Sequence, residues 1–159
     1  MIKILTPELS LIKTMQFPKK FKASKKKYRC LIGVGANVGQ PLRTFKKFIK
    51  YLCRNSQIDP VKTSPILKNP PFGYLKQPYF YNFCLLVKTN LAPLALLKIL
   101  QNIEKIFQRK KSFRNAPRSL DLDIIFFENK RFYNKRLVIP HVNWRERQSV
   151  LIPLILMDY

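Results

Sequence analysis

The fold is decided by the stretch PRSLDLDIIFF, residues 117–127. Its apolar and polar side chains alternate, which predicts a β-strand, because successive side chains of a strand point to opposite faces. We expect Leu122, Ile124 and Phe126 on one face and Asp121, Asp123 and Ile125 on the other. The two carboxylates then share a face, roughly 6.5–7 Å apart at about 3.3 Å per residue.

Two like charges so close together are unfavourable unless cations lie between them. The bland interpretation of Asp121 and Asp123 is a solvated strand end. The preceding segment favours a binding role instead, because residues 105–120 contain no acid and six bases: Lys105, Arg109, Lys110, Lys111, Arg114 and Arg118. Hard oxygen ligands beside cations indicate a site for a Mg²⁺-bound polyphosphate.

The composition predicts one packed domain with anionic partners. The chain has 159 residues and a formal charge of +23, from 31 Lys+Arg against 8 Asp+Glu, and this favours nucleotides, nucleic acid or acidic surfaces. Cys30, Cys53 and Cys84 lie far apart in apolar contexts, which indicates buried thiols. With no long apolar run and no signal-peptide pattern, we expect a cytoplasmic protein without a membrane partner.

Residues 1–28 form a basic N-terminal extension, and residues 29–159 form the main domain. The first half of the extension alternates weakly, and residues 19–27 are a charge run with little to bury. We expect partial disorder, or a loose strand or helix laid on the body.

The remaining pattern gives the order of elements. Strands are predicted at 28–34, 58–64 and 79–89, and amphipathic helices at 41–53 and 93–107. A proline-fixed loop is expected at 65–78, a turn at 128–130 with 131–133 pairing back, and short apolar segments at 137–141 and 151–156. The order predicts an α+β fold, a ferredoxin-like split βαβ with a mainly antiparallel sheet and helices packed on its faces.

Several motifs, in one order over roughly residues 29–156, resemble those of the hydroxymethyl-dihydropterin pyrophosphokinase family of folate biosynthesis. They are GVGANVG at 33–39, NPPFG at 69–73 with Gln77-Pro78, Asn82, PRSLDLDI at 117–124, RLVIPH at 136–141, Arg147, and Pro153-Leu154. The resemblance implies pyrophosphate transfer from ATP to the hydroxymethyl group of 6-hydroxymethyl-7,8-dihydropterin, with release of AMP.

The resemblance also implies roles for the ATP side of the site. Asp121 and Asp123 would hold two Mg²⁺ ions that bridge the phosphates of ATP, which agrees with the interpretation from spacing. Arg118 would contact phosphates, as would Arg109 and Lys111 from a loop that closes over the nucleotide. Ile124 would touch adenine. The remaining ATP contacts would come from Arg136, His141 and Arg147.

On the pterin side the resemblance implies a pocket built by one loop and one strand. Asn82 would read the pterin edge, Phe80 would stack on its ring, and Pro70, Pro71 and Phe72 would line the pocket. Ser149 stands where many members carry a second stacking ring. The expected partners are ATP and the reduced pterin, and we expect a monomer.

Two alternatives stay open at the level of sequence. A basic ferredoxin-like domain could bind single-stranded nucleic acid, because an aromatic sheet can stack bases and +23 charge attracts phosphates. No Lys/Arg-Gly-Phe/Tyr-Gly/Ala-Phe stretch supports this alternative, and we do not expect nucleic acid as a partner. A degenerate relative that binds pterin or nucleotide without turnover is the other alternative.

Overall fold

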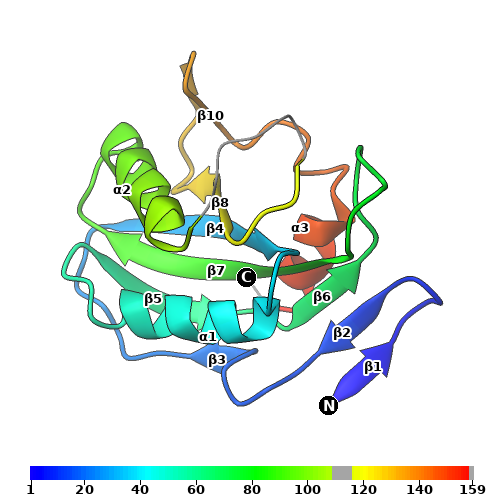
Figure 1. Cartoon of the computed structure of the whole chain (residues 1–159). Coiled ribbons are helices and arrows are strands. Elements are labelled where there is room, and N and C mark those ends of the chain that lie inside the picture. The colour runs from blue at the N-terminus through cyan, green and yellow to red at the C-terminus, as the bar shows by residue number, and fades with distance from the viewer. Residues whose placement is uncertain (109–115, 158–159) are drawn as a thin grey trace.

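The computed structural model describes residues 1–108 and 116–157. In chain order, the elements are β1 (Ile2–Ile4), β2 (Ser10–Ile12), β3 (Lys19–Lys20), β4 (Tyr28–Ala36), α1 (Pro41–Leu52), β5 (Ile58–Thr63), β6 (Ile66–Asn69), β7 (Phe80–Thr89), α2 (Pro93–Ile106), β8 (Asp121–Phe127), β9 (Phe132–Asn134), β10 (Leu137–Ile139) and α3 (Gln148–Ile155). Figure 1 shows their arrangement.

The main sheet is antiparallel and runs β1-β2-β6-β7-β4-β8. Strand β5 pairs with the other half of β7, so β5 and β6 act as two parts of one long strand interrupted at Ser64 and Pro65. The two halves of the split motif are therefore β4–α1–β5/β6 and β7–α2–β8. This confirms the predicted α+β fold with a ferredoxin-like arrangement.

Helices cover both faces of the sheet (Figure 1). Helices α1 and α2 pack on one face, where the apolar stripe of α1 meets β4, β7 and β8; this stripe consists of Phe45, Phe48, Ile49 and Leu52. Helix α3 packs on the other face, where Val150 joins Leu31, Cys84 and Ile125. We call these the α1 face and the α3 face.

One face assignment in the key strand was wrong. Leu31 pairs with Phe126 and Ile32 with Ile124, so Ile125 is an extra residue that forms a β-bulge. The bulge shifts the alternation by one, and Phe126 lies on the α3 face with Ile125, where its ring meets that of Trp144 at 4.7 Å. Asp121 and Asp123 precede the bulge and share the α3 face, as predicted.

Three other local predictions were wrong. The proline-rich loop begins with a strand, β6, which was expected to be irregular. Strand β9 pairs with β10 instead of returning to β8, because the turn at Asn134 closes a separate hairpin. Cys53 is exposed at the end of α1, whereas Cys30 and Cys84 are buried as expected.

Residues 1–28 contain three short strands laid on the sheet edge. That residues 1–28 form a unit separate from the main domain stays a prediction. Among the described residues, no helix has the length and apolarity needed to cross a lipid bilayer.

Candidate active site

Asn37 ties three segments together at the end of β4. Its main-chain N–H donates to the carbonyl of Arg118 at 2.9 Å, and its Oδ1 accepts from the Arg118 N–H at 2.8 Å. Its Nδ2 donates to Gln77 Oε1 at 2.8 Å and to the Pro78 carbonyl at 3.1 Å. Asn37 is buried, so these bonds replace water. Sequence reasoning missed this role, for which the signal was one amide side chain set among glycines.

Glu104 fixes the start of β8 from α2. Its buried carboxylate accepts a hydrogen bond from the main-chain N–H of Leu122 at 2.8 Å. A buried charge needs such a donor. The bond is made at the residue between Asp121 and Asp123, so α2 sets the position of the strand that carries both carboxylates.

Two glycines of β4, which we call the glycine strip, lie between Asn82 and the carboxylates. Gly35 pairs with Asn82 on one side and with Asp121 on the other, and Gly33 pairs with Asp123. A Cβ atom at Gly35 would lie 2.6 Å from Asn82 Oδ1, closer than real Cβ atoms approach. Glycine at Gly35 therefore leaves room for the Asn82 amide, and at Gly33 the side chain of Ile125 lies beside the position that a Cβ atom would take.

Cations stand beside both aspartates. Arg118 forms an ion pair with Asp121 through its Nη1. His141 Nε2 lies 3.9 Å from Asp123 Oδ2, and Arg147 Nη1 lies 3.6 Å from the same oxygen. The main-chain N–H of His141 donates to the Ile125 carbonyl at 2.9 Å, which holds the histidine beside β8. The structure thus brings together five predicted site residues.

The charge on Asp123 is disfavoured in the folded protein. Burial, and then the neighbouring charge of Asp121, raise the pKa of Asp123 above the usual range of an aspartate. His141, Arg147 and Arg118 act in the opposite direction without cancelling the rise. Part of the rise in pKa arises because two carboxylates lie close together on one face of the sheet.

We predict that Asp123→Asn stabilises the metal-free protein at neutral pH. A carboxyl with a raised pKa contributes stability that is present at low pH and lost as the pH rises through the folded-state pKa. Asparagine carries no charge at any of these pH values, so the variant does not lose this stability as the pH rises. Its thermal midpoint, measured in EDTA, should lie slightly above that of the parent at neutral pH, because the Asp123 side chain is 37% exposed and water screens part of the repulsion, and the gap should close towards about pH 4.

Asp59 provides a control of opposite sign. Burial acts to raise the pKa of Asp59, but hydrogen bonds from Ser24 and Lys26 together lower it. Asp59→Asn should therefore reduce the thermal midpoint at neutral pH. If Asp123→Asn also lowered the thermal midpoint, this result would refute the inferred repulsion between the carboxylates of Asp121 and Asp123.

The carboxylate pair fits a divalent cation. Its ligands are hard oxygens, and a cation would relieve the repulsion between Asp121 and Asp123 that helps to raise the pKa of Asp123. Among the described residues, no group of three or more His, Cys, Asp or Glu side chains could hold a metal alone. Such a site suits Mg²⁺, which is commonly held by one or two carboxylates together with phosphate oxygens.

Two other predicted ATP contacts, Ile124 and Arg136, lie away from this cluster. Ile124 is buried in the core on the α1 face, so it could touch a ligand on the α3 face only through its main chain. Arg136 is exposed in the turn between β9 and β10. Arg109 and Lys111 lie outside the described residues.

The predicted pterin residues surround the end of β6. Pro70 and Pro71 follow β6 directly, and Phe72 is 83% exposed. Phe80 and Asn82 alternate with Tyr81, so they share the α3 face with the aspartates. Asn82 Nδ2 donates to Asn69 Oδ1 at 2.7 Å, a partner that sequence reasoning did not identify.

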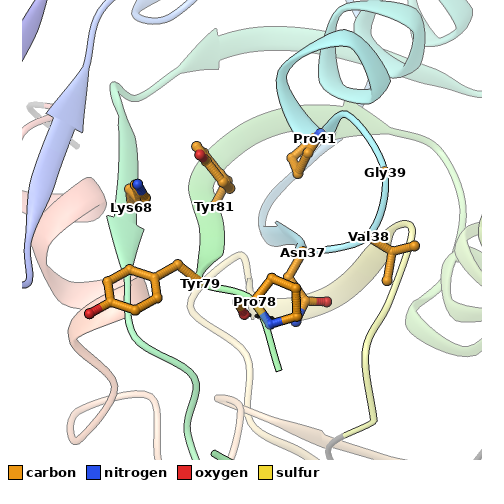
Figure 2. A pocket seen from close by; sticks show the side chains of 8 residues that line it. All are labelled: Asn37, Val38, Gly39, Pro41, Lys68, Pro78, Tyr79 and Tyr81. Atoms are coloured by element: carbon orange, nitrogen blue, oxygen red, sulfur yellow. Dashed lines mark hydrogen bonds between the residues drawn. The ribbon is translucent and has the colours of Figure 1, made fainter. Parts of the chain in front are cut away.

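A separate hollow of about 570 Å³ lies beside the first turn of α1 (Figure 2). Tyr81 and Lys68 line it from the α1 face, and the Lys68 ammonium stands 5.5 Å from the centre of the Tyr79 ring. Asn37 and Pro78 form its floor, joined by the hydrogen bond drawn in Figure 2. The hollow lies across the sheet from the aspartates, so it is distinct from the carboxylate site.

Paired carboxylates that can hold metal ions, with several cations on the same face, are groups that enzymes of phosphoryl transfer use. The fold and the site therefore define a phosphate-transferring enzyme. Residues 31–158 match the family model described as 7,8-dihydro-6-hydroxymethylpterin-pyrophosphokinase. The chain belongs to this family, which confirms the resemblance inferred from its motifs.

Similar proteins agree with this assignment. The chain is 42% identical over 132 residues to the 2-amino-4-hydroxy-6-hydroxymethyldihydropteridine pyrophosphokinase of Helicobacter pylori, covering 82% of this chain and 81% of the relative. It is 40% identical to the enzyme of that name from Campylobacter jejuni, covering 80% and 82%, and 33% identical to that from Bacillus subtilis, covering 77% and 74%. The comparisons give no support to the nucleic-acid-binding alternative.

Proposed function

We propose that this protein transfers pyrophosphate from ATP to the hydroxymethyl group of 6-hydroxymethyl-7,8-dihydropterin. The pterin oxygen forms a bond to the β-phosphorus, the bond from that phosphorus to the α,β-bridging oxygen breaks, and AMP leaves with the bridging oxygen. The hydroxyl proton is released. The observation that carries the proposal is that Asp121, Asp123 and Asn82 share one face of the sheet, where Gly35 of β4 pairs with Asn82 on one side and with Asp121 on the other.

Asp121 and Asp123 would hold Mg²⁺, with two ions as the proposed number. When bound, Mg²⁺ supplies charge neutralisation at the phosphates and at the leaving oxygen of AMP. The chain's own contribution is positioning, because phosphoryl-type transfer needs alignment and charge stabilisation more than covalent chemistry. No nucleophilic side chain is required.

The cations beside the aspartates are placed for the phosphates. In the ligand-free structure Arg118 pairs with Asp121, and Arg147 and His141 approach Asp123. Once the carboxylates are neutralised, these groups can turn to phosphate oxygens, which Arg binds in a bidentate manner. Arg109, Lys111 and Arg136 complete the proposed ATP contacts, with Ile124 as a main-chain contact to adenine.

Asn82 has one orientation that suits recognition of the pterin. Its Nδ2 is engaged by Asn69, so its Oδ1 faces the strip at Gly35. A side-chain carbonyl so placed can accept a hydrogen bond from an N–H on the pterin edge. Phe80 would stack on the ring, while the loop residues Pro70, Pro71 and Phe72 would line the pocket.

We predict that Asn69→Ala raises the KM for the pterin about tenfold, because Asn82 loses the acceptor that sets its orientation. The KM for ATP should stay the same. Steady-state kinetics with each substrate varied in turn measures both values. Asn69→Asp keeps an acceptor at that position and should restore most of the affinity, whereas equal losses in both variants would contradict the orienting role.

The proposed reaction is tested by incubating the protein with ATP, Mg²⁺ and the pterin alcohol and by resolving the products. AMP and a pterin heavier by one pyrophosphoryl group are expected in equal amounts. Formation of ADP, or no AMP, would refute the reaction. Sedimentation and localisation measurements would test the expectation of a cytoplasmic monomer.

A further inference from the structure

The N-terminal segment, residues 1–28, lies wholly outside residues 31–158, which match the family model. Its second strand, β2, pairs with β6: Ser10 with Lys68, Leu11 with Leu67 and Ile12 with Ile66. Strand β6 is therefore enclosed between β2 and β7. Without β2, β6 would be an edge strand of four residues, and strand edges open most readily.

The direction of each amide in β2 follows from the hairpin geometry. Met1 and Lys13 exchange both main-chain hydrogen bonds, at 3.0 and 2.9 Å. Bonded and non-bonded pairs alternate along an antiparallel ladder, so Leu11 also bonds to β1. The amides of Ser10 and Ile12 consequently point to the other side and bond to β6.

Side chains fix this segment to the body of the protein. Phe17 is 1% exposed, and its ring packs edge-on against that of Phe83 at 4.7 Å. Thr63 Oγ1 accepts from the Lys19 N–H at 2.9 Å and donates to the Gln16 carbonyl at 2.8 Å. The segment is thus held to the body of the protein a few residues after β2.

The last residue of β6 is the one that orients Asn82. Asn69 Oδ1 accepts from Asn82 at 2.7 Å, and Asn69 Nδ2 donates to the Pro70 carbonyl at 2.8 Å, at the start of the loop. Ser10 pairs with Lys68, the residue directly before Asn69. Only one hydrogen-bonded strand therefore separates the N-terminal segment from the pterin side of the site.

We propose that β2 is a positioning element for pterin recognition: it holds β6 so that Asn69 can orient Asn82 and begin the loop in place. This inference rests on the proposed function for its kinetic consequence. Its structural consequence, protection of β6, is independent of the reaction.

The test compares the same substitution in two neighbouring ladders of the full-length protein. Ser10→Pro removes an amide that bonds to β6, whereas Lys3→Pro removes one that bonds to Leu11 in β2. For Ser10→Pro we expect faster hydrogen exchange at the Ile66 and Lys68 amides and a pterin KM about tenfold higher, with the KM for ATP and kcat unchanged. Lys3→Pro should match the parent in all four quantities.

Unchanged exchange at Ile66 and Lys68 in Ser10→Pro would overturn the positioning role, whatever the activity. Faster exchange with an unchanged pterin KM would overturn its link to recognition. If the parent protein itself makes no AMP, the proposed function fails, and the exchange data alone then decide whether β2 holds β6. Should Ser10→Pro fail to fold by circular dichroism, Leu11→Ser provides a milder detachment of β2 with the same expected pattern.

Discussion

Asp121→Asn and Asp123→Asn each lower turnover at least about 10²-fold while the fold stays intact. Each asparagine keeps the shape of the side chain and removes the charge that would attract Mg²⁺. The fold should persist in Asp123→Asn because the charge of Asp123 is disfavoured in the metal-free state. It should persist in Asp121→Asn because the amide oxygen can still accept a hydrogen bond from Arg118. Rates of AMP release at saturating ATP and pterin, together with circular dichroism spectra, measure both effects.

The control for this loss is Asp59→Asn. Asp59 lies in β5, where it pairs with Lys26 at 3.0 Å on a part of the sheet remote from β8. The same chemical change there should leave turnover unaltered. Near-normal turnover in Asp121→Asn or Asp123→Asn would refute the assignment of metal ligands.

Gly35→Ala raises the KM for the pterin about tenfold or more and leaves the KM for ATP unchanged. A methyl group at this position would lie 2.6 Å from Asn82 Oδ1, so the amide must turn away. The displaced oxygen is the one that faces the strip and is proposed to read the pterin edge. Kinetics with the pterin varied at saturating ATP gives the value.

Gly33→Ala is the matched control two residues earlier on the same strand. Its added Cβ would lie 3.2 Å from Ile125 Cδ1, the end of a flexible side chain that can move aside. The pterin KM of this variant should therefore stay close to that of the parent. Equal effects of the two substitutions would show that the loss at Gly35 comes from general damage to β4.

The elements with strong periodicity could be predicted from the sequence. Helices α1 and α2 and strands β4, β7 and β8 carry long regular patterns, and their order was enough for the ferredoxin-like topology. Strand β6 escaped prediction because it has only four residues before the two prolines. The face of Phe126 depends on a one-residue bulge at Ile125, which is set by pairing with β4 and leaves no local signal.

Candidate site residues could be predicted from the sequence where they belong to a recognisable motif. The pair of aspartates, Arg118, His141 and Arg147 meet on one face as the motifs implied. The supporting contacts were not predictable, because they join distant parts of the chain. Asn37 reaches Gln77 and Arg118, and Asn69 reaches Asn82, only after the sheet has formed.

Asp121 and Asp123 are proposed to bind divalent metal together with the phosphates of ATP. A crystal grown with Mn²⁺ and a non-hydrolysable ATP analogue tests it through anomalous scattering. We expect metal peaks at about 2.1 Å from carboxylate oxygens of both aspartates, with Arg118 turned from Asp121 to a phosphate. A bound nucleotide with no metal peak there, and Arg118 still paired with Asp121, would refute the metal site at the two aspartates.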